Sequence, residues 1–350
     1  MMQMLDLPHR VADYLCPVNG LCDIFEWKAG QRIPEELVFY SRLGFLLISQ
    51  KRADPPKMIF LSNSGIGRRQ FEFWRGLMDY RIYSSEGKTF KTTLSEIMEL
   101  IDKGIPVILF GLDMFYLPYH KKFYHTLHIP GHVILMTGYD EHAVYVLDNS
   151  KAGTRKVPFE DLMQAWAKDY IGISKKNAYF GIEFEDGERD VKSIVQTAYQ
   201  ISAENFINPM AGFSGVRGID KFTKEFPEWK ERYDAITLHH IYTHFVTFIG
   251  STLPWPPEEI TGSPSGMNNP HKGCRDKLSQ AMNTYRNQYG SENWTKAAAL
   301  FEESGTIIEE ISNGFVKDIL ADSYNNTDHY INLFHRFKQL ELAAFELLID

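Results

Sequence analysis

Two short apolar runs joined by a polar turn are the feature that most constrains the fold. Residues 132–136 (His-Val-Ile-Leu-Met) and 143–147 (Ala-Val-Tyr-Val-Leu) read as strands, and the segment between them is short enough for a hairpin. We therefore expect the two strands to be antiparallel neighbours. Because the start of one then lies beside the end of the other, His132 should come close to Asp148.

The rest of the chain separates into two patterns. Helical spacing near the N-terminus is followed by strand-like runs, which predicts an α+β domain with helices first and an antiparallel sheet after them. After the charged stretch 185–190, apolar residues recur every three or four positions, which is typical of helices. A chain of 350 residues also exceeds one ordinary core. We expect a domain over residues 1–186 and an all-α domain over 187–350.

Cysteine usage singles out one thiol. Cys16 precedes Pro17, and proline is favoured in the first turn of a helix, so Cys16 stands where a helix begins. A helix N-terminus and a nearby imidazole both favour the reactive thiolate. Cys22 falls inside the same helix and reads as a core residue, and Cys274 carries no signal. We interpret Cys16, His132 and Asp148 as nucleophile, base and orienting carboxylate, although each alone has an ordinary structural explanation.

Composition limits the other classes of function. Three cysteines are too few for a disulfide framework, and the N-terminus lacks the apolar core of a signal peptide, so we expect a cytoplasmic protein. A net charge of -8 argues against nucleic-acid binding, and no apolar run is long enough to span a membrane. The histidines at positions 120, 125 and 128 match no familiar ligand spacing, so we expect no metal site.

Several segments resemble known families. The stretch 131–150 (GHVILMTGYDEHAVYVLDNS) is similar to the histidine-to-aspartate segment of papain-like enzymes of the bacteriocin-leader peptidase type. Residues 15–20 (LCPVNG), 34–37 (PEEL) and 113–119 (DMFYLPY) resemble the family of butirosin biosynthesis protein H, and residues 212–219 (GFSGVRGI) with Trp294 resemble its helical C-terminal domain. The resemblance covers nearly the whole chain and implies a papain-like fold followed by a helical domain.

The activity implied by this resemblance is acyl transfer in secondary-metabolite (antibiotic) biosynthesis. An acyl group would leave the phosphopantetheine thioester of an acyl carrier protein, rest on Cys16, and pass to a small amine acceptor. No cofactor would be bound. Asn19 would assist backbone N–H groups in stabilising the oxyanion. Tyr116, Pro118 and Tyr119 either line the substrate pocket or form a structural loop.

Two departures from the family pattern keep other functions open. Arg10 stands where papain-like peptidases place an oxyanion-binding glutamine, and residues 266–270 (GMNNP), within the loop 254–270, replace an expected Gly-rich segment. The alternatives are a cysteine peptidase or amidohydrolase, and a non-catalytic binding protein on the same fold. An acidic chain would need a basic patch to receive an acidic carrier, and we considered Arg68 with Arg69 or Lys121 with Lys122. The sequence does not determine whether the protein forms a homo-oligomer.

Overall fold

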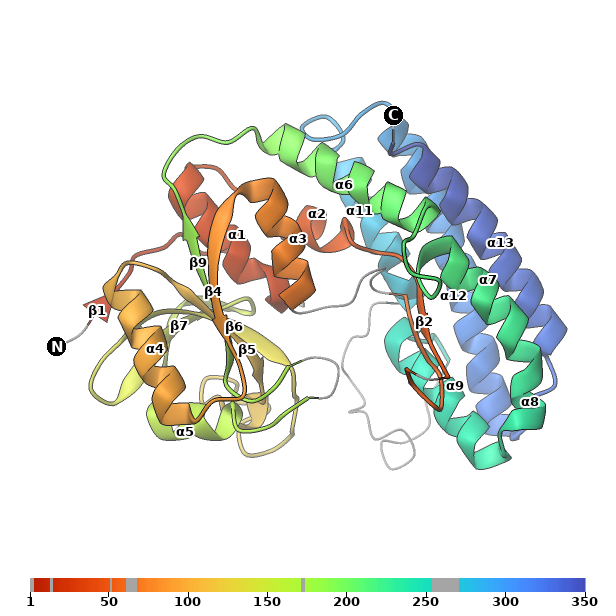
Figure 1. The fold of residues 1–350 in the computed structure, drawn as a ribbon, viewed down its shortest axis with the longest axis horizontal. Coiled ribbons are helices and arrows are strands. Elements are labelled where there is room, and N and C mark those ends of the chain that lie inside the picture. The colour runs from red at the N-terminus through yellow and green to blue at the C-terminus, as the bar shows by residue number, and fades with distance from the viewer. Residues whose placement is uncertain are drawn as a thin grey trace. The chain divides into compact units, whose positions relative to one another are not determined.

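A computed structural model describes residues 3–12, 15–50, 52–60, 68–170, 174–253 and 271–349 (Figure 1). The chain divides into two compact units, Met1–Phe39 with Ile66–Asp190, and Tyr40–Gly65 with Val191–Asp350. The second unit resumes at Val191, a few residues after the boundary expected at 186/187. The segment 40–65 was not anticipated in the second unit, because its only strand-like signal is a short apolar run.

The first unit is built on an antiparallel sheet. Its strand order is β4-β9-β5-β6-β7-β8, and β1 pairs with β6. The strands are β1 (Gln3–Met4), β4 (Tyr80–Ser85), β5 (Val107–Leu112), β6 (His132–Tyr139), β7 (Ala143–Asp148), β8 (Lys151–Pro158) and β9 (Ala178–Phe184). The predicted hairpin is β6-β7, with Leu135 opposite Leu147. Strands β4 and β8 were not predicted, because their sequences are largely polar and half-exposed or exposed.

Helices cover both faces of this sheet. The helices of the first unit are α1 (Cys16–Ala29), α2 (Glu35–Tyr40, which ends in the second unit), α3 (Arg68–Met78), α4 (Phe90–Asp102) and α5 (Phe159–Ala165), with a short 3-10 turn η1 (Met114–Tyr116). Side chains of α4 and α5 share one core with alternate residues of β5, β6 and β7. Helix α1 contacts the sheet through β5, β6, β7 and β9. Thr89 caps α4 by accepting from the Thr92 N–H.

Gly20 allows α1 to lie close to the sheet. A Cβ at this position would stand 3.1 Å from the Leu135 Cβ and 3.5 Å from the Ile108 Cγ1. Any side chain there would therefore push α1 away from β6. Since Cys16 opens α1 and His132 opens β6, this contact contributes to the spacing of the two residues.

Replacing Gly20 by valine should therefore destabilise the protein. We expect a loss of about 1–3 kcal/mol in the free energy of unfolding, because the added methyl groups overpack the helix-sheet contact. Gly76→Val in α3 is the matched control, since a Cβ at Gly76 meets nothing within 4 Å. Urea unfolding measures both variants. Equal stability of the two would contradict the close packing at Gly20.

The second unit is largely helical. Its helices are α6 (Val191–Ile207), α7 (Gly215–Glu225), α8 (Trp229–Arg232), α9 (Ala235–Ile249), α11 (Arg275–Tyr285), α12 (Asn293–Ala321) and α13 (Thr327–Glu346), with 3-10 turns η2 (Phe226–Glu228) and η3 (His271–Cys274). Strands β2 (Leu46–Ile48) and β3 (Lys57–Ile59) pair antiparallel beside them. Among the described residues after 187, every helix or strand is a helix, as expected, but the unit to which they belong also includes this strand pair.

Aromatic packing explains why residues 40–65 join the helices. Phe45 packs edge-on against Phe334 at 5.8 Å between ring centroids, and Phe60 packs against Phe337 at 5.4 Å. All four rings are buried. The helical unit thus completes its core with aromatic residues from the N-terminal half of the sequence.

The predicted fold class is confirmed: an α+β region with an antiparallel sheet precedes a largely helical region. The order within the first unit differs in detail, since β4 lies between α3 and α4 along the chain. In the part of the chain that the structure describes, no helix has the length and apolar character needed to cross a membrane. The loop 254–270 lies outside the described residues.

Candidate active site

Cys16 is the first residue of α1 and is half-buried. The N–H groups of Val18 and Asn19 both donate to the Leu15 carbonyl at 3.1 Å, and Pro17 has no N–H. The Cys16 N–H makes no hydrogen bond with another described residue. The helix start therefore presents one thiol next to one backbone donor that no described residue engages.

His132 is the first residue of β6 and is held by Asp148, the last residue of β7. Its Nε2 donates to the Asp148 Oδ2 over 2.7 Å, and both side chains are buried. The other ring nitrogen, Nδ1, is then left free of Asp148, and Cys16 lies close enough to His132 to raise the pKa of its ring. The structure thus brings together the three residues that the sequence nominated. Irregularities in the β5-β6 and β7-β8 ladders lie beside His132 and Asp148, where they redirect side chains.

The electrostatics of this group favour a charged imidazole. Burial alone would lower the pKa of His132, but the Asp148 carboxylate and Cys16 together raise it to about 10. Burial would likewise favour a protonated Asp148, yet the charge and hydrogen bonds of His132 and His120 hold the pKa of that carboxyl well below its usual range. An imidazolium next to a thiol stabilises the thiolate, which is the nucleophilic form.

Asp148 is held by more groups than the sequence indicated. Its Oδ2 also accepts from the Tyr119 hydroxyl at 2.9 Å and from the His120 Nε2 at 3.1 Å. Its Oδ1 accepts from the Ser150 N–H and hydroxyl at 2.9 and 2.8 Å. These donors fix the carboxylate that orients His132. Tyr119, expected in a substrate pocket, therefore also supports the site, and no spacing rule would have linked either His120 or Tyr119 to Asp148.

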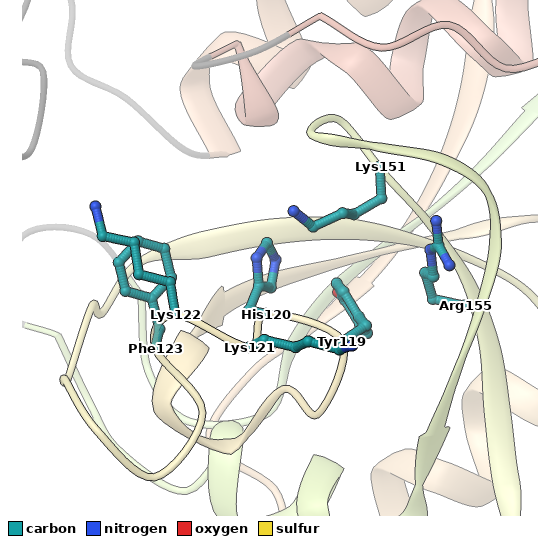
Figure 2. Close-up of a pocket in the computed structure, with 7 residues that line it drawn as sticks. All are labelled: Tyr119, His120, Lys121, Lys122, Phe123, Lys151 and Arg155. Carbon is teal, nitrogen blue, oxygen red and sulfur yellow. The ribbon is translucent and has the colours of Figure 1, made fainter.

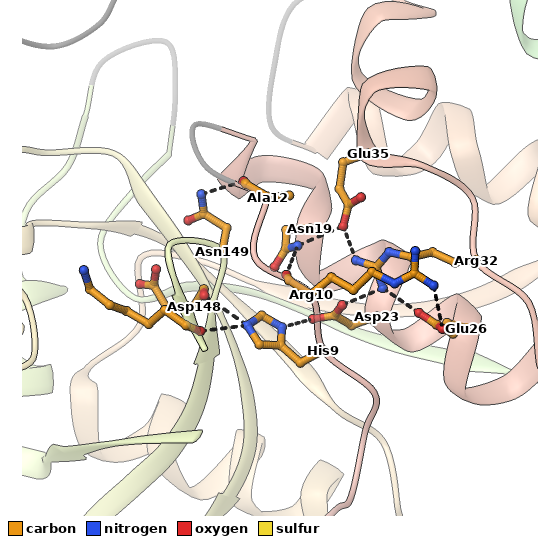
Figure 3. A network of polar contacts seen from close by, with 11 residues as sticks. His9, Arg10, Ala12, Asn19, Asp23, Glu26, Arg32, Glu35, Asp148 and Asn149 are labelled. Atoms are coloured by element: carbon orange, nitrogen blue, oxygen red, sulfur yellow. Dashed lines mark hydrogen bonds and ion pairs between the residues drawn. The ribbon is translucent and has the colours of Figure 1, made fainter. Parts of the chain in front are cut away.

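A buried polar network holds the Asp148 turn against α1 (Figure 3). The His9 Nε2 lies 3.1 Å from the Asp148 carbonyl and 3.0 Å from the Lys151 carbonyl, while its Nδ1 lies 2.6 Å from the Asp23 Oδ2. All three partners are acceptors, so both ring nitrogens donate and His9 is an imidazolium. Burial opposes this charge, but the hydrogen bond and charge of Asp23 raise the pKa of His9. Arg32 neutralises Asp23 from the other side at 2.8 Å.

Asn19 belongs to this network and does not fit the oxyanion role expected of it. Its Nδ2 donates to the Arg10 carbonyl at 3.0 Å and to the Glu35 Oε1 at 2.9 Å, which uses both amide hydrogens. The Arg10 side chain is itself exposed and lies 3.3 Å from Glu26. The donors left for an oxyanion are therefore backbone groups, and the Cys16 N–H is the one that the geometry supports.

The other two cysteines are buried. Burial raises the pKa of the Cys22 thiol well above its usual value, with a further contribution from Glu35, and burial likewise raises that of Cys274. Both thiols are therefore protonated and inaccessible at neutral pH. Cys16 is the single half-exposed cysteine.

The remaining candidate residues lie around the 3-10 turn. Tyr116 packs beside Phe115, on which His125 and His128 stack at 5.3 and 4.0 Å between centroids, so the three nominated histidines do not converge on one point. Pro118 is half-buried in the same loop. Gly131 adopts a φ of +87° with nothing within 4 Å of an added Cβ, so glycine is favoured there by the backbone turn.

One set of side chains could hold a metal ion. His120, His132 and Asp148 offer ligand atoms that all lie within 4.8 Å of one another. In the structure these atoms are already hydrogen-bonded to each other. A metal there would take the His132–Asp148 contact that orients the imidazole toward Cys16.

A cysteine at a helix start, facing a histidine and a carboxylate on an antiparallel sheet, is the arrangement of papain-type cysteine enzymes. Residues 16–149 match the family model described as butirosin biosynthesis protein H, N-terminal, and residues 160–252 match a domain of unknown function, DUF4872. The resemblance found in the sequence is thereby confirmed: the chain carries an N-terminal domain of the butirosin biosynthesis protein H family, followed by a DUF4872 region.

Two further comparisons were made. A solved structure described as a C39-like peptidase from Bacillus anthracis aligns with a TM-score of 0.35 and 18% identity, covering 53% of this chain and 100% of that one. No curated protein shows significant similarity to the chain.

Proposed function

We propose that this protein is a thiol-dependent acyltransferase. It takes an acyl group from the phosphopantetheine thioester of a carrier protein, holds it on Cys16, and delivers it to an amine acceptor in the biosynthesis of a secondary metabolite. The observation that carries the proposal is the Cys16–His132–Asp148 arrangement, in which His132 is hydrogen-bonded to Asp148 and both partners raise its pKa. The match to the butirosin biosynthesis protein H family supports a carrier-bound acyl donor.

The first half-reaction forms the acyl-enzyme. The Cys16 thiolate attacks the thioester carbonyl, and the developing oxyanion accepts a hydrogen bond from the Cys16 N–H. Collapse of this intermediate breaks the original carbon-sulfur bond. The departing pantetheine thiolate takes the proton of the His132 imidazolium, so His132 becomes neutral while Asp148 keeps its ring oriented.

The second half-reaction releases the product. An amine attacks the acyl-Cys16 carbonyl, and the neutral His132 accepts the proton that the amine loses. Expulsion of the Cys16 thiolate forms the amide and restores the thiolate-imidazolium pair. If water replaces the amine, the same groups catalyse hydrolysis, which is the peptidase or amidohydrolase alternative.

One observation favours a second candidate function, a binding protein without catalysis. The Arg10 side chain is hydrogen-bonded to Glu26, and both amide hydrogens of Asn19 are already donated. Neither side chain is therefore left to bind the oxyanion. The acyltransferase would then depend on the backbone donor at Cys16 alone.

A butyryl-pantetheine thioester tests the proposal. Intact-protein mass spectrometry should show one butyryl adduct, and peptide mapping should place it on Cys16. The Cys16→Ala variant should show no adduct, while Cys22→Ala and Cys274→Ala act as matched controls that retain it. Adding a panel of small amines should then discharge the adduct as amides faster than water does.

Other outcomes distinguish the alternatives. Discharge to butyrate alone, unaffected by any amine, would favour the hydrolase. Absence of any adduct, with intact binding of pantetheine compounds, would favour the binding protein.

A further inference from the structure

A basic cavity lies beside the Asp148 end of the site. Its volume is about 360 Å³, within the size range of small-molecule sites, and its walls are Tyr119, His120, Lys121, Lys122, Phe123, Lys151 and Arg155. Residues 119–123 come from the loop after η1, and Lys151 and Arg155 come from β8. In Figure 2, His120 stands between Lys151 and Arg155 on one side and Lys122 and Phe123 on the other.

The cationic side chains of this cavity lack anionic partners. Among the residues that the structure describes, neither the three lysines nor Arg155 takes part in an ion pair. The Arg155 Nη2 donates to the Ala152 carbonyl, but its buried Nε has no hydrogen-bond partner. The next residue, Lys156, shows the contrast, because it is paired with Asp140 at 2.7 Å.

Four cationic side chains around one cavity stand out in a chain with a net charge of -8. Their mutual repulsion raises the free energy of the empty cavity, and a bound anion would relieve it. Arginine offers a planar pair of donors and lysine a mobile point charge, a combination suited to a phosphate group. The half-buried Tyr119 and Phe123 add an apolar wall against which an uncharged chain could lie.

The position of the cavity indicates which part of a substrate it would receive. His120 lines the cavity and donates to Asp148, whereas Cys16 and His132 are not among its walls. A group bound there is therefore near the site but removed from the reacting carbonyl. In the proposed donor, the phosphate is separated from the thioester by the pantetheine chain.

From these observations we infer that the cavity formed by Lys121, Lys122, Lys151 and Arg155 binds the phosphate of the pantetheine arm of the acyl donor. This inference rests on the proposed function for the identity of the donor. The anion site itself rests on the unpaired cations.

Binding of unacylated ligands tests the inference without any catalysis. Calorimetric titrations would compare phosphopantetheine, pantetheine and inorganic phosphate. We expect phosphopantetheine to bind at least about tenfold more tightly than pantetheine, with a preference that weakens as salt is added. The double variant Lys151→Met, Arg155→Met should lose this preference. The double variant Lys121→Met, Lys122→Met, which replaces the two exposed lysines of the cavity wall, should lose it as well. The matched control Lys156→Met, which removes a paired lysine one residue away, should keep it.

The outcomes separate this inference from the proposed function. Equal binding of phosphopantetheine and pantetheine, or a preference untouched by both double variants, would overturn the phosphate site. Inorganic phosphate binding as tightly as phosphopantetheine would keep an anion site but overturn its assignment to the pantetheine arm. A preserved preference without acylation of Cys16 by the thioester would support the site while removing the acyltransferase proposal.

Discussion

In a His132→Ala variant, alkylation of Cys16 by iodoacetamide at pH 7 should slow by about tenfold or more, because an ordinary thiol of pKa about 8.5 is only a few per cent ionised at this pH. The physical reason is the loss of the imidazolium. Burial of His132 opposes its charge, but Asp148 and Cys16 raise its pKa to about 10, so the wild-type ring is charged at neutral pH. Without that charge, the nucleophilic form of a neighbouring thiol loses its electrostatic stabilisation. Mass spectrometry of each cysteine-containing peptide gives the rate for Cys16 separately from Cys22 and Cys274.

His120→Ala provides the matched control for that measurement. His120 also donates to the Asp148 Oδ2, but burial lowers its pKa, so it is neutral where His132 is charged. Removing it should change the rate at Cys16 much less than removing His132. If the two variants slow alkylation equally, the assignment of His132 as the partner of Cys16 is wrong.

The same pair sets a pH window for stability. The pKa of His132 is raised above its unfolded value of 6.5, so its contribution to stability is complete below about pH 6.5 and is lost as the pH rises through about 10. The pKa of Asp148 is depressed, so its contribution is present above its ordinary value of 3.8 and is lost as the pH falls through the folded pKa. Both contributions are complete between about pH 3.8 and about pH 6.5, and the charged form of His132 should persist up to about pH 10.

Local sequence was sufficient to place His132 beside Asp148 and Cys16 at a helix start. The hairpin is specified by β-branched runs and a short turn, and its reversal brings His132 to Asp148 without any long-range information. Pro17 similarly marks the start of α1 at Cys16. That Cys16 reaches His132 was supported by resemblance alone, because the contact depends on how α1 packs on the sheet through Gly20.

The features that sequence analysis missed depend on distant partners. Asn19 was nominated to assist in binding the oxyanion, but Glu35 and the Arg10 carbonyl occupy its amide. Lys151 and Arg155 carry no local signal, and the cavity that joins them to residues 119–123 exists only in the folded unit. Residues 40–65 belong to the second unit because their aromatic side chains pack against residues far away in the sequence. Local sequence patterns do not reveal such contacts.

The fully buried Arg275 holds several segments of the second unit together. We expect its replacement to cause the largest loss of stability. Its Nε and Nη2 hold the Glu341 carboxylate at 2.6 and 2.9 Å. Its guanidinium also donates to the carbonyls of Phe60, Gly273 and Gly44, so one side chain ties residues 40–65 to α11 and α13. Water cannot take the place of the Arg275 guanidinium, because Arg275 and Glu341 are both 0% exposed.

Arg275→Met should therefore lower the free energy of unfolding by about 3–5 kcal/mol, because it leaves the Glu341 charge buried without its partner. Arg336→Met is the matched control: this exposed arginine of α13 pairs with Glu303 at 2.7 Å, and its loss should cost about 0–1 kcal/mol. Adding Glu341→Leu to Arg275→Met should recover part of the loss, since the unpaired charge is then removed as well. Urea unfolding followed by tryptophan fluorescence compares the variants. If the added Glu341→Leu recovers nothing, the cost lies in the three unpaired carbonyls and not in the buried charge.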